Sequence, residues 1–223
     1  MDTSVTPFED RQQAGKELAI ALDRHRGTNS MLLAIPRGGV VVAYEVATAL
    51  GLDLDVIVPR KIGAPGQPEL AIGAVASWGN HEFILDDQSV RYLGVPDDYI
   101  ASEVDAQLAE ISRRVVAYRG TSEPPDIESR SVILIDDGIA TGYTTRAAAL
   151  AVRNLKASHI TLAVPVAPME SLDGIRQYVD EIVCLKTPYP FLAVGYWYQD
   201  FTQVSDEEVI SLLNAARCRN PGV

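Results

Sequence analysis

Five short apolar runs alternate with helical stretches along the chain. The runs begin at Met31, Asp55, Val132, His159 and Glu181. The third run, Val132 to Ile135, is apolar on both faces and β-branched at three of its four positions, which is typical of a central parallel strand covered by helices on both sides. The alternation predicts an α/β fold with a doubly wound, mostly parallel five-stranded sheet.

Several segments predict additions to this sheet. Apolar residues recur every four positions between Phe8 and His25, which indicates an amphipathic helix, and a helical stripe lies between Pro96 and Tyr118. Leu70 to Ser77 and Glu82 to Leu85 predict a small hairpin. The Gly- and Pro-rich stretch at 62–69 favours a flexible loop. We therefore expect one domain over 1–223, with a flexible loop at 62–69, an insertion at about 70–120 and a C-terminal hood segment at about 186–203.

Charge and composition exclude some classes of function. Thirty acidic against 19 basic residues give a net charge of −11, which repels nucleic acid and anionic lipid, and no basic run offsets it. The N-terminus shows no signal peptide, and no apolar run approaches membrane-spanning length. Cys184 and Cys218 predict free thiols in a reducing compartment, and His25, His81 and His159 lack metal-ligand spacing. We expect a cytoplasmic protein with neither nucleic acid nor membrane as a partner.

The stretch Val132 to Thr144 combines a buried strand, two acids and a loop of small residues. Asp136 and Asp137 follow the strand at its carboxyl end, where open α/β sheets bind their ligands. The small residues of the loop allow backbone amides to approach an anion, and the following helix points its N-terminus at the same place. A turn with solvated acids is the structural alternative. The coincidence of these features within one segment favours a site for a phosphate and a polyhydroxyl or metal-bound group.

This stretch resembles the phosphoribosyl pyrophosphate (PRPP) signature of the type I phosphoribosyltransferases: four apolar residues, two acids, a short variable loop and Thr-Gly. The signature also occurs in PRPP synthetases and in a few PRPP-binding regulators. The resemblance implies that Asp136 and Asp137 hold the ribose hydroxyls and Mg²⁺, the metal directly, through water or through PRPP, and that Ala140 to Thr144 wrap the 5′-phosphate. The implied PRPP-binding set is Asp136, Asp137, Gly138, Ile139, Ala140, Thr141, Gly142, Tyr143 and Thr144.

Two further segments offer cations after predicted strands. Arg37, Gly38 and Gly39 form a loop in which the glycines permit close approach and the guanidinium suits phosphate oxygens, although a tight turn with an exposed Arg explains it equally well. Arg60 and Lys61 follow the second core strand, and they are either solvated or paired with anions. In the resembled family the loop after the first core strand holds pyrophosphate, and adenine and orotate phosphoribosyltransferases have an Arg-Lys pair that contacts it. The resemblance thus assigns these five residues to pyrophosphate, and implies that the 62–69 loop closes over the reacting centre.

The segment Thr187 to Phe201 concentrates aromatic residues. It is equally explained as a hydrophobic lid, as a dimer contact or as a wall that stacks on a planar base. Phe191, Val194 and Tyr196 loosely resemble the base-binding segment of 6-oxopurine phosphoribosyltransferases, so the resemblance implies base contacts there. The exposed aromatics are also compatible with a homodimer.

The leading hypothesis is a Mg²⁺-dependent phosphoribosyltransferase that joins PRPP to a nitrogenous base and releases pyrophosphate. Its catalytic residues are expected to be Arg37, Arg60, Lys61, Asp136 and Asp137, which position the ribose and meet the charge that develops on pyrophosphate. The 6-oxopurine enzymes have an Asp where this chain has Ala140, so that proton-exchanging role is vacant. The loop is closer to adenine, uracil and orotate enzymes.

The whole chain, with Phe8-Glu-Asp-Arg near its start, most resembles a group of predicted phosphoribosyltransferases whose acceptor is unsettled. The first alternative is a non-catalytic PRPP- or nucleotide-binding regulator on the same fold. The second is a PRPP synthetase, which needs an ATP site that the sequence does not reveal.

Overall fold

The main sheet has five parallel strands in the order β2-β1-β6-β7-β8. The computed structural model describes residues 6–78 and 83–219. The strands of this sheet are β1 (Met31–Ala34), β2 (Asp53–Val56), β6 (Ser131–Ile135), β7 (His159–Val166) and β8 (Glu181–Lys186). The predicted doubly wound parallel sheet is therefore confirmed.

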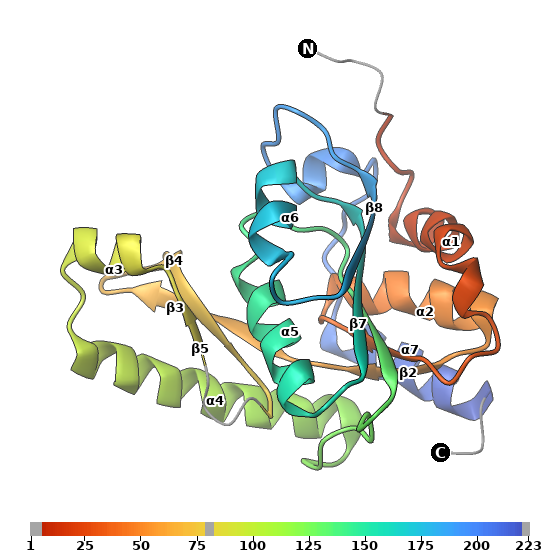
Figure 1. The fold of residues 1–223 in the computed structure, drawn as a ribbon, viewed down its shortest axis with the longest axis horizontal. Helices are drawn as coiled ribbons and strands as arrows, with labels where there is room; N and C mark the ends of the chain where they lie inside the picture. Colours follow the sequence, from red (N-terminus) through yellow and green to blue (C-terminus); the bar gives the residue numbers. More distant parts are fainter. Residues whose placement is uncertain (1–5, 79–82, 220–223) are drawn as a thin grey trace.

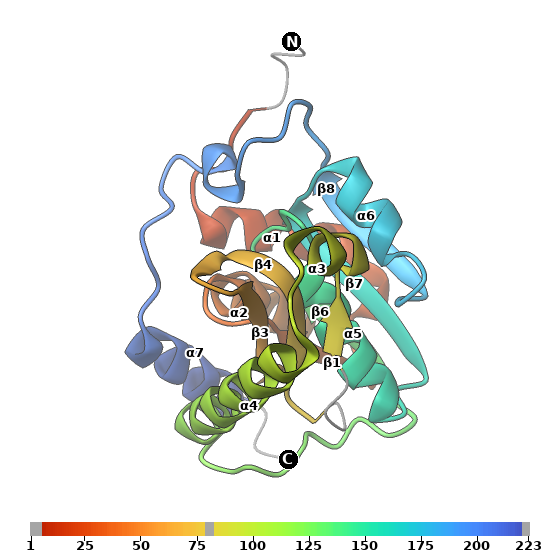
Figure 2. The ribbon, with the colours of Figure 1, turned by 90° about the vertical axis from the view of Figure 1, so that its left-hand side faces the viewer.

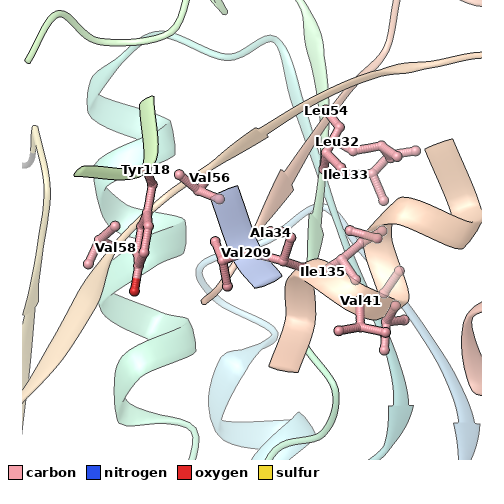
Figure 3. Packing of buried hydrophobic residues seen from close by; sticks show 14 of the residues in the cluster. Leu32, Ala34, Val41, Leu54, Val56, Val58, Tyr118, Ile133, Ile135 and Val209 are labelled. Atoms are coloured by element: carbon pink, nitrogen blue, oxygen red, sulfur yellow. The ribbon is translucent and has the colours of Figure 1, made fainter. Parts of the chain in front are cut away.

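Helices cover both faces of this sheet, and they divide the core into two layers. One face carries α1 (Arg11–Ala21), α2 (Gly38–Leu50) and α7 (Asp206–Arg219), with the short 3₁₀ helix η1 (Asp23–His25) after α1. The other face carries α5 (Tyr143–Asn154) and α6 (Met169–Ile175). Successive strand residues point to opposite faces, so Ile133 and Ile135 pack with Val41 and Val209 in the first layer (Figure 3), while Leu134 belongs to the second. Burial on both faces explains why the sequence of β6 is continuously apolar.

A second, antiparallel sheet projects to one side of the first (Figures 1 and 2). Its order is β3-β4-β5, with the strands β3 (Pro59–Ala64), β4 (Gln67–Ala76) and β5 (Phe83–Leu85), and it is followed by α3 (Asp87–Leu93) and the long α4 (Asp97–Arg119). The pairing of β4 with β5 confirms the expected hairpin, whose connection at 79–82 lies outside the described residues. The long helix was expected, whereas α3 was not.

The expected loop at 62–69 is instead part of a hairpin. Strand β3 continues to Ala64 and β4 begins at Gln67, which leaves Pro65 and Gly66 as the turn. Ile62 is fully buried, and Gly63 lies so close to Pro68 that a Cβ on Gly63 would come within 2.7 Å of the Pro68 carbonyl oxygen. The glycine that suggested a loop therefore marks a close approach and a register shift between two strands.

The same hairpin corrects the position of the Arg-Lys pair. The second core strand ends at Val56, before the pair. Arg60 and Lys61 lie within β3, opposite Val75 and Ala74 of β4. The apolar run that predicted one strand over 55–59 thus spans the passage from one sheet to the other.

The C-terminal segment runs from β8 through the short 3₁₀ helix η2 (Val194–Trp197) to α7. It meets the start of the chain in a parallel bridge between Phe8 and Tyr198. Within the two described ranges, no helix has both the length and the apolar character that crossing a bilayer requires.

Candidate functional site

The predicted site lies at the topological switch point of the main sheet. From β1 the chain passes through α2 to β2 on one side, and from β6 it passes through α5 to β7 on the other. The loops that follow these adjacent strands lie side by side at the carboxyl edge of the sheet, which is where open α/β sheets bind their ligands. The two motifs that the sequence placed about one hundred residues apart are therefore neighbours.

The glycines after β1 lie directly against the acid pair after β6. A Cβ on Gly38 would come within 1.9 Å of the Asp137 carboxylate, and one on Gly39 would come within 2.9 Å of the Asp136 Cα. Only residues without side chains fit at this distance. The structure thus brings Gly38 and Gly39 together with Asp136 and Asp137, as one site requires.

Burial shapes the electrostatics of the acid pair. Asp136 Oδ1 accepts a hydrogen bond of 2.8 Å from the Asp137 backbone N–H. Burial, and next the charge of Asp137, raises the pKa of Asp136 well above its ordinary value. Burial also raises the pKa of Asp137, although the guanidinium of Arg11 opposes this effect. A ligand that brings hydroxyl donors or a cation would stabilise the charged form of these two buried carboxyl groups.

The loop after the acid pair is fixed by hydrogen bonds from neighbouring segments, and backbone groups without a capping side chain lie where it leads into α5. The Ile139 N–H donates to the Val166 carbonyl at 3.0 Å, and the Ser171 hydroxyl donates to the Ala140 carbonyl. Gly142, at φ +79°, precedes the first turn of α5 and offers no capping side chain. The amides at this helix start suit an anion, as the sequence predicts for Ala140 to Thr144.

Tyr143, at the start of α5, ties the loop to the small sheet. Its hydroxyl donates to Asp86 Oδ2 at 2.6 Å, while Asp86 caps α3 by accepting from the N–H groups of Gln88 and Ser89. The hydrogen bond from Tyr143, and next that from the Ser89 hydroxyl, lowers the pKa of Asp86 to about 2. Sequence reasoning missed this link.

We expect Tyr143→Phe to cost about 1 kcal/mol of unfolding free energy at pH 7, because one hydrogen bond to a charged group is lost. The pKa of Asp86 is lowered on folding, so its stabilisation is present above the unfolded value and declines as the pH falls toward 2. Urea unfolding at pH 7 and pH 3 measures both effects. Tyr99→Phe removes a neutral bond of 3.1 Å to the Gly63 carbonyl and should cost the same at both pH values. Equal losses for Tyr143→Phe at the two pH values would contradict the assignment.

Two of the three predicted cations lie beside the start of α5, at the end of the loop that follows the acid pair. Arg60 and Lys61 share a cleft of about 330 Å³ with Thr144 of α5. The Arg60 guanidinium donates to Gln107, which in turn donates to Glu103 Oε1 at 2.7 Å. The cleft therefore contains two cationic side chains that could donate to an anion, and hydrogen bonds through Gln107 and Glu103 orient one of them, Arg60.

Arg37 is directed elsewhere. Its Nη1 lies 3.6 Å from Asp206 Oδ1, at the start of α7, and Asp206 also accepts from the Tyr118 hydroxyl at 2.6 Å. The guanidinium is partly exposed and its ion pair is long. Arg37 thus follows the strand that the sequence predicted, but its side chain does not line the cleft of Arg60 and Lys61.

The aromatic segment covers the loop of the acid pair. A Cβ on Gly138 would lie 2.5 Å from Val194 Cγ1, so Val194 packs directly on this loop. Phe191 stacks on Trp197, with ring centroids 6.4 Å apart. The side chain of Tyr196 is 67% exposed. Among the three predicted base contacts, Val194 thus lies directly against the loop.

Sequence reasoning missed two residues that touch Asp137. Arg11 Nε donates to Asp137 Oδ2 at 2.7 Å, and the Tyr198 hydroxyl donates to the Asp137 carbonyl oxygen at 2.5 Å. Arg11 belongs to the Phe8-Glu-Asp-Arg stretch that the sequence singled out, but no local spacing connects it with an acid 126 positions later.

The acid pair could contribute to a metal site but does not complete one. The described residues hold no group of three or more His, Cys, Asp or Glu side chains placed to bind a metal ion. Carboxylate oxygens suit Mg²⁺, which commonly binds one or two carboxylates together with substrate phosphates. The donor set therefore fits a magnesium ion that shares its ligands with a phosphate-bearing substrate.

Comparison with known proteins relates the chain to phosphoribosyl transferases. The family model described as "Phosphoribosyl transferase domain" matches residues 4–199. "Putative phosphoribosyl transferase Rv0571c" of Mycobacterium tuberculosis is 42% identical over 209 residues, which cover 94% of this chain and 47% of that protein. The chain thus spans about half the length of this relative.

Two more proteins match most of the chain. A uracil phosphoribosyltransferase of Lactobacillus gasseri is 26% identical over 171 residues, covering 72% of this chain and 76% of that protein. The crystal structure of TT1426 from Thermus thermophilus superposes with a TM-score of 0.77 at 39% identity, covering 93% of this chain and 98% of that one.

Proposed function

Because the chain belongs to the phosphoribosyl transferase family, we propose that it transfers the 5-phosphoribosyl group of PRPP to a nitrogenous base and releases pyrophosphate. The observation that carries this proposal is the contact of Gly38 and Gly39 with Asp137 and Asp136 at the switch point. It joins a pyrophosphate-type loop and a ribose-type acid pair at one edge of the sheet.

Different residues of the site bind different parts of PRPP. Asp136 and Asp137 accept hydrogen bonds from the ribose hydroxyls, and the amides at the start of α5 bind the 5′-phosphate. Arg60 and Lys61 meet the pyrophosphate in the cleft beside Thr144. Arg37 joins them by exchanging its long ion pair with Asp206 for pyrophosphate.

Catalysis follows from where charge develops. As the bond between C1 and pyrophosphate breaks, the ribose becomes oxocarbenium-like and negative charge accumulates on the leaving group. Guanidinium and ammonium groups stabilise that charge, and the two carboxylates balance the cation. Mg²⁺, held by the acid pair and the donor, would add further positive charge at the leaving group. Val194 and its neighbours cover the loop and limit the access of water.

The proposal is tested by titrating the protein with PRPP in the presence and absence of Mg²⁺. We expect binding that depends on magnesium and that is lost in the double variant with Asp136→Asn and Asp137→Asn. Losing one preorganised charge contact should lower the rate by about 10² to 10³. Wild-type PRPP affinity in the double variant would overturn the assignment.

A panel of bases with a pyrophosphate assay separates a transferase from a regulator. The panel begins with uracil, because one relative is a uracil phosphoribosyltransferase, and continues with adenine, orotate, hypoxanthine and guanine. Base-dependent release of pyrophosphate supports the transferase. Tight PRPP binding without such release would favour the regulatory alternative.

A further inference from the structure

Arg11 is held by contacts with two distant parts of the chain. Its Nε lies 2.7 Å from Asp137 Oδ2, and its Nη1 donates to the Thr202 carbonyl at 2.9 Å. The centre of its guanidinium lies 3.9 Å from the centroid of the Phe201 ring. The side chain of Arg11 is only 10% exposed. A planar guanidinium can stack on the ring while its edge donates to both oxygens, whereas an ammonium is a compact point charge without that fixed geometry.

Backbone hydrogen bonds bring Arg11 to this place. The Phe8 N–H donates to the Trp197 carbonyl at 2.8 Å, and the Gln199 N–H donates to the Phe8 carbonyl at 2.8 Å. The Asp200 N–H donates to the Glu9 carbonyl at 2.9 Å. The segment that leads into α1 and the C-terminal segment therefore form one unit, and Arg11 extends from it to the acid pair.

The glycine after β1 leaves room for this ion pair. A Cβ on Gly38 would lie 2.7 Å from Arg11 Nε and 1.9 Å from Asp137 Oδ2, which is within the ion pair itself. The Tyr198 hydroxyl fixes the backbone of Asp137 from the same C-terminal segment. The side chain and the main chain of Asp137 are thus both held by the unit of N- and C-terminal segments.

We propose that Arg11 is a positioning residue of the donor site, which orients Asp137 toward the ribose hydroxyls and holds residues 197–202 against the acid pair. This inference rests on the proposed function, because it names the residue that prepares one ribose-binding acid. It assigns a role to the conspicuous Arg of the Phe8-Glu-Asp-Arg stretch.

The first test measures the dissociation constant of PRPP with Mg²⁺ by calorimetry, using the full chain. Arg11→Gln should weaken binding about tenfold, within the coupling that contacting residues show, and Arg11→Lys should recover part of the loss because it keeps the charge. In an Asp137→Asn background, Arg11→Gln should add little, because the partner that it positions is already changed.

A matched control is available in the buried pair between Arg119 and Asp55, outside the site. Its atoms lie 2.9 Å apart, its side chains are 7% and 11% exposed, and Arg119 also lies over an aromatic ring, that of Trp78. Arg119→Gln should lower the melting temperature but leave the dissociation constant unchanged. Wild-type affinity in Arg11→Gln, or a loss that simply adds to that of Asp137→Asn, would overturn the role of Arg11 and leave the proposed function standing.

The second test needs no ligand. Hydrogen exchange of the free protein should be faster at the amides of Gln199 and Asp200 in Arg11→Gln than in the wild type or in Arg119→Gln. If the wild type fails to bind PRPP, the proposed function falls, and this exchange measurement still decides whether Arg11 fastens the segment. Unchanged exchange at both amides would then overturn the inference as well.

Discussion

Gly38→Ala is expected to weaken PRPP binding by about 100-fold or more, the scale of losing a preorganised charge contact. The new methyl group would occupy the space between Arg11 and Asp137, 1.9 Å from the carboxylate oxygen. Contacts below 3.0 Å force a displacement. Here the displaced group is the short, buried side chain of Asp137, whose partner Arg11 is also buried and held in place. The carboxylate would have to rotate away from the position in which it meets the ribose.

Gly51, which follows the other end of α2, provides the control for Gly38→Ala. Its φ is +70°, and a Cβ there would meet nothing within 4 Å. Gly51→Ala should therefore cost about 1 kcal/mol of stability through backbone strain, without altering PRPP affinity. Calorimetric titration of both variants, with melting curves to confirm that each is folded, makes the comparison. Wild-type affinity in Gly38→Ala would contradict the geometry of the site.

The strands of the main sheet were predictable because their causes are local. Strand β6 is apolar at successive positions because both of its faces are buried, and that pattern is visible in the sequence. Open α/β sheets bind ligands beyond the ends of parallel strands, so Asp136, Asp137, Gly38 and Gly39 were predicted as site residues from their places after two such runs. Their contact required the strand order, which the topology supplies.

The small sheet was predicted less well because glycine and proline have two structural uses. In 62–69 they suggested a loop, whereas Gly63 permits a close approach between strands and Gly66, at φ +70°, makes the turn. The position of Arg60 in β3 follows from the same hairpin. Residue type alone does not distinguish a bulged hairpin from an irregular loop.

Contacts between distant segments were outside the reach of sequence patterns. Arg11 and Asp137 are separated by 126 positions, and Tyr198 reaches the same acid from the C-terminal segment. The apolar periodicity of the first helix indicated core packing and gave no reason to connect Arg11 with the acid pair. A polar residue at the end of an amphipathic helix acquires such a partner only when the whole chain is folded.

The two adjacent acids should respond to the same substitution to different extents. Burial and the charge of Asp137 raise the pKa of Asp136 on folding, so the folded protein loses stability as the pH rises from the unfolded value, near 4, to the folded value. Asp136→Asn removes that loss and retains an oxygen that accepts from the Asp137 N–H. We expect a gain in unfolding free energy that is larger at pH 8 than at pH 5, because a raised pKa in the folded protein costs stability only above the unfolded value.

Asp137→Asn should gain less stability than Asp136→Asn, because Arg11 opposes the rise in the pKa of Asp137 and its buried guanidinium would be left without a counter-charge. Urea unfolding of both variants at pH 5 and pH 8, in EDTA and without PRPP, measures the two effects. Both variants are expected to bind PRPP more weakly. If Asp136→Asn gains stability and loses affinity, Asp136 lowers the stability of the fold and is present because it binds the ligand. A loss of stability in Asp136→Asn would show instead that this carboxylate is compensated in the free protein, and that the charge of Arg11 serves both members of the pair.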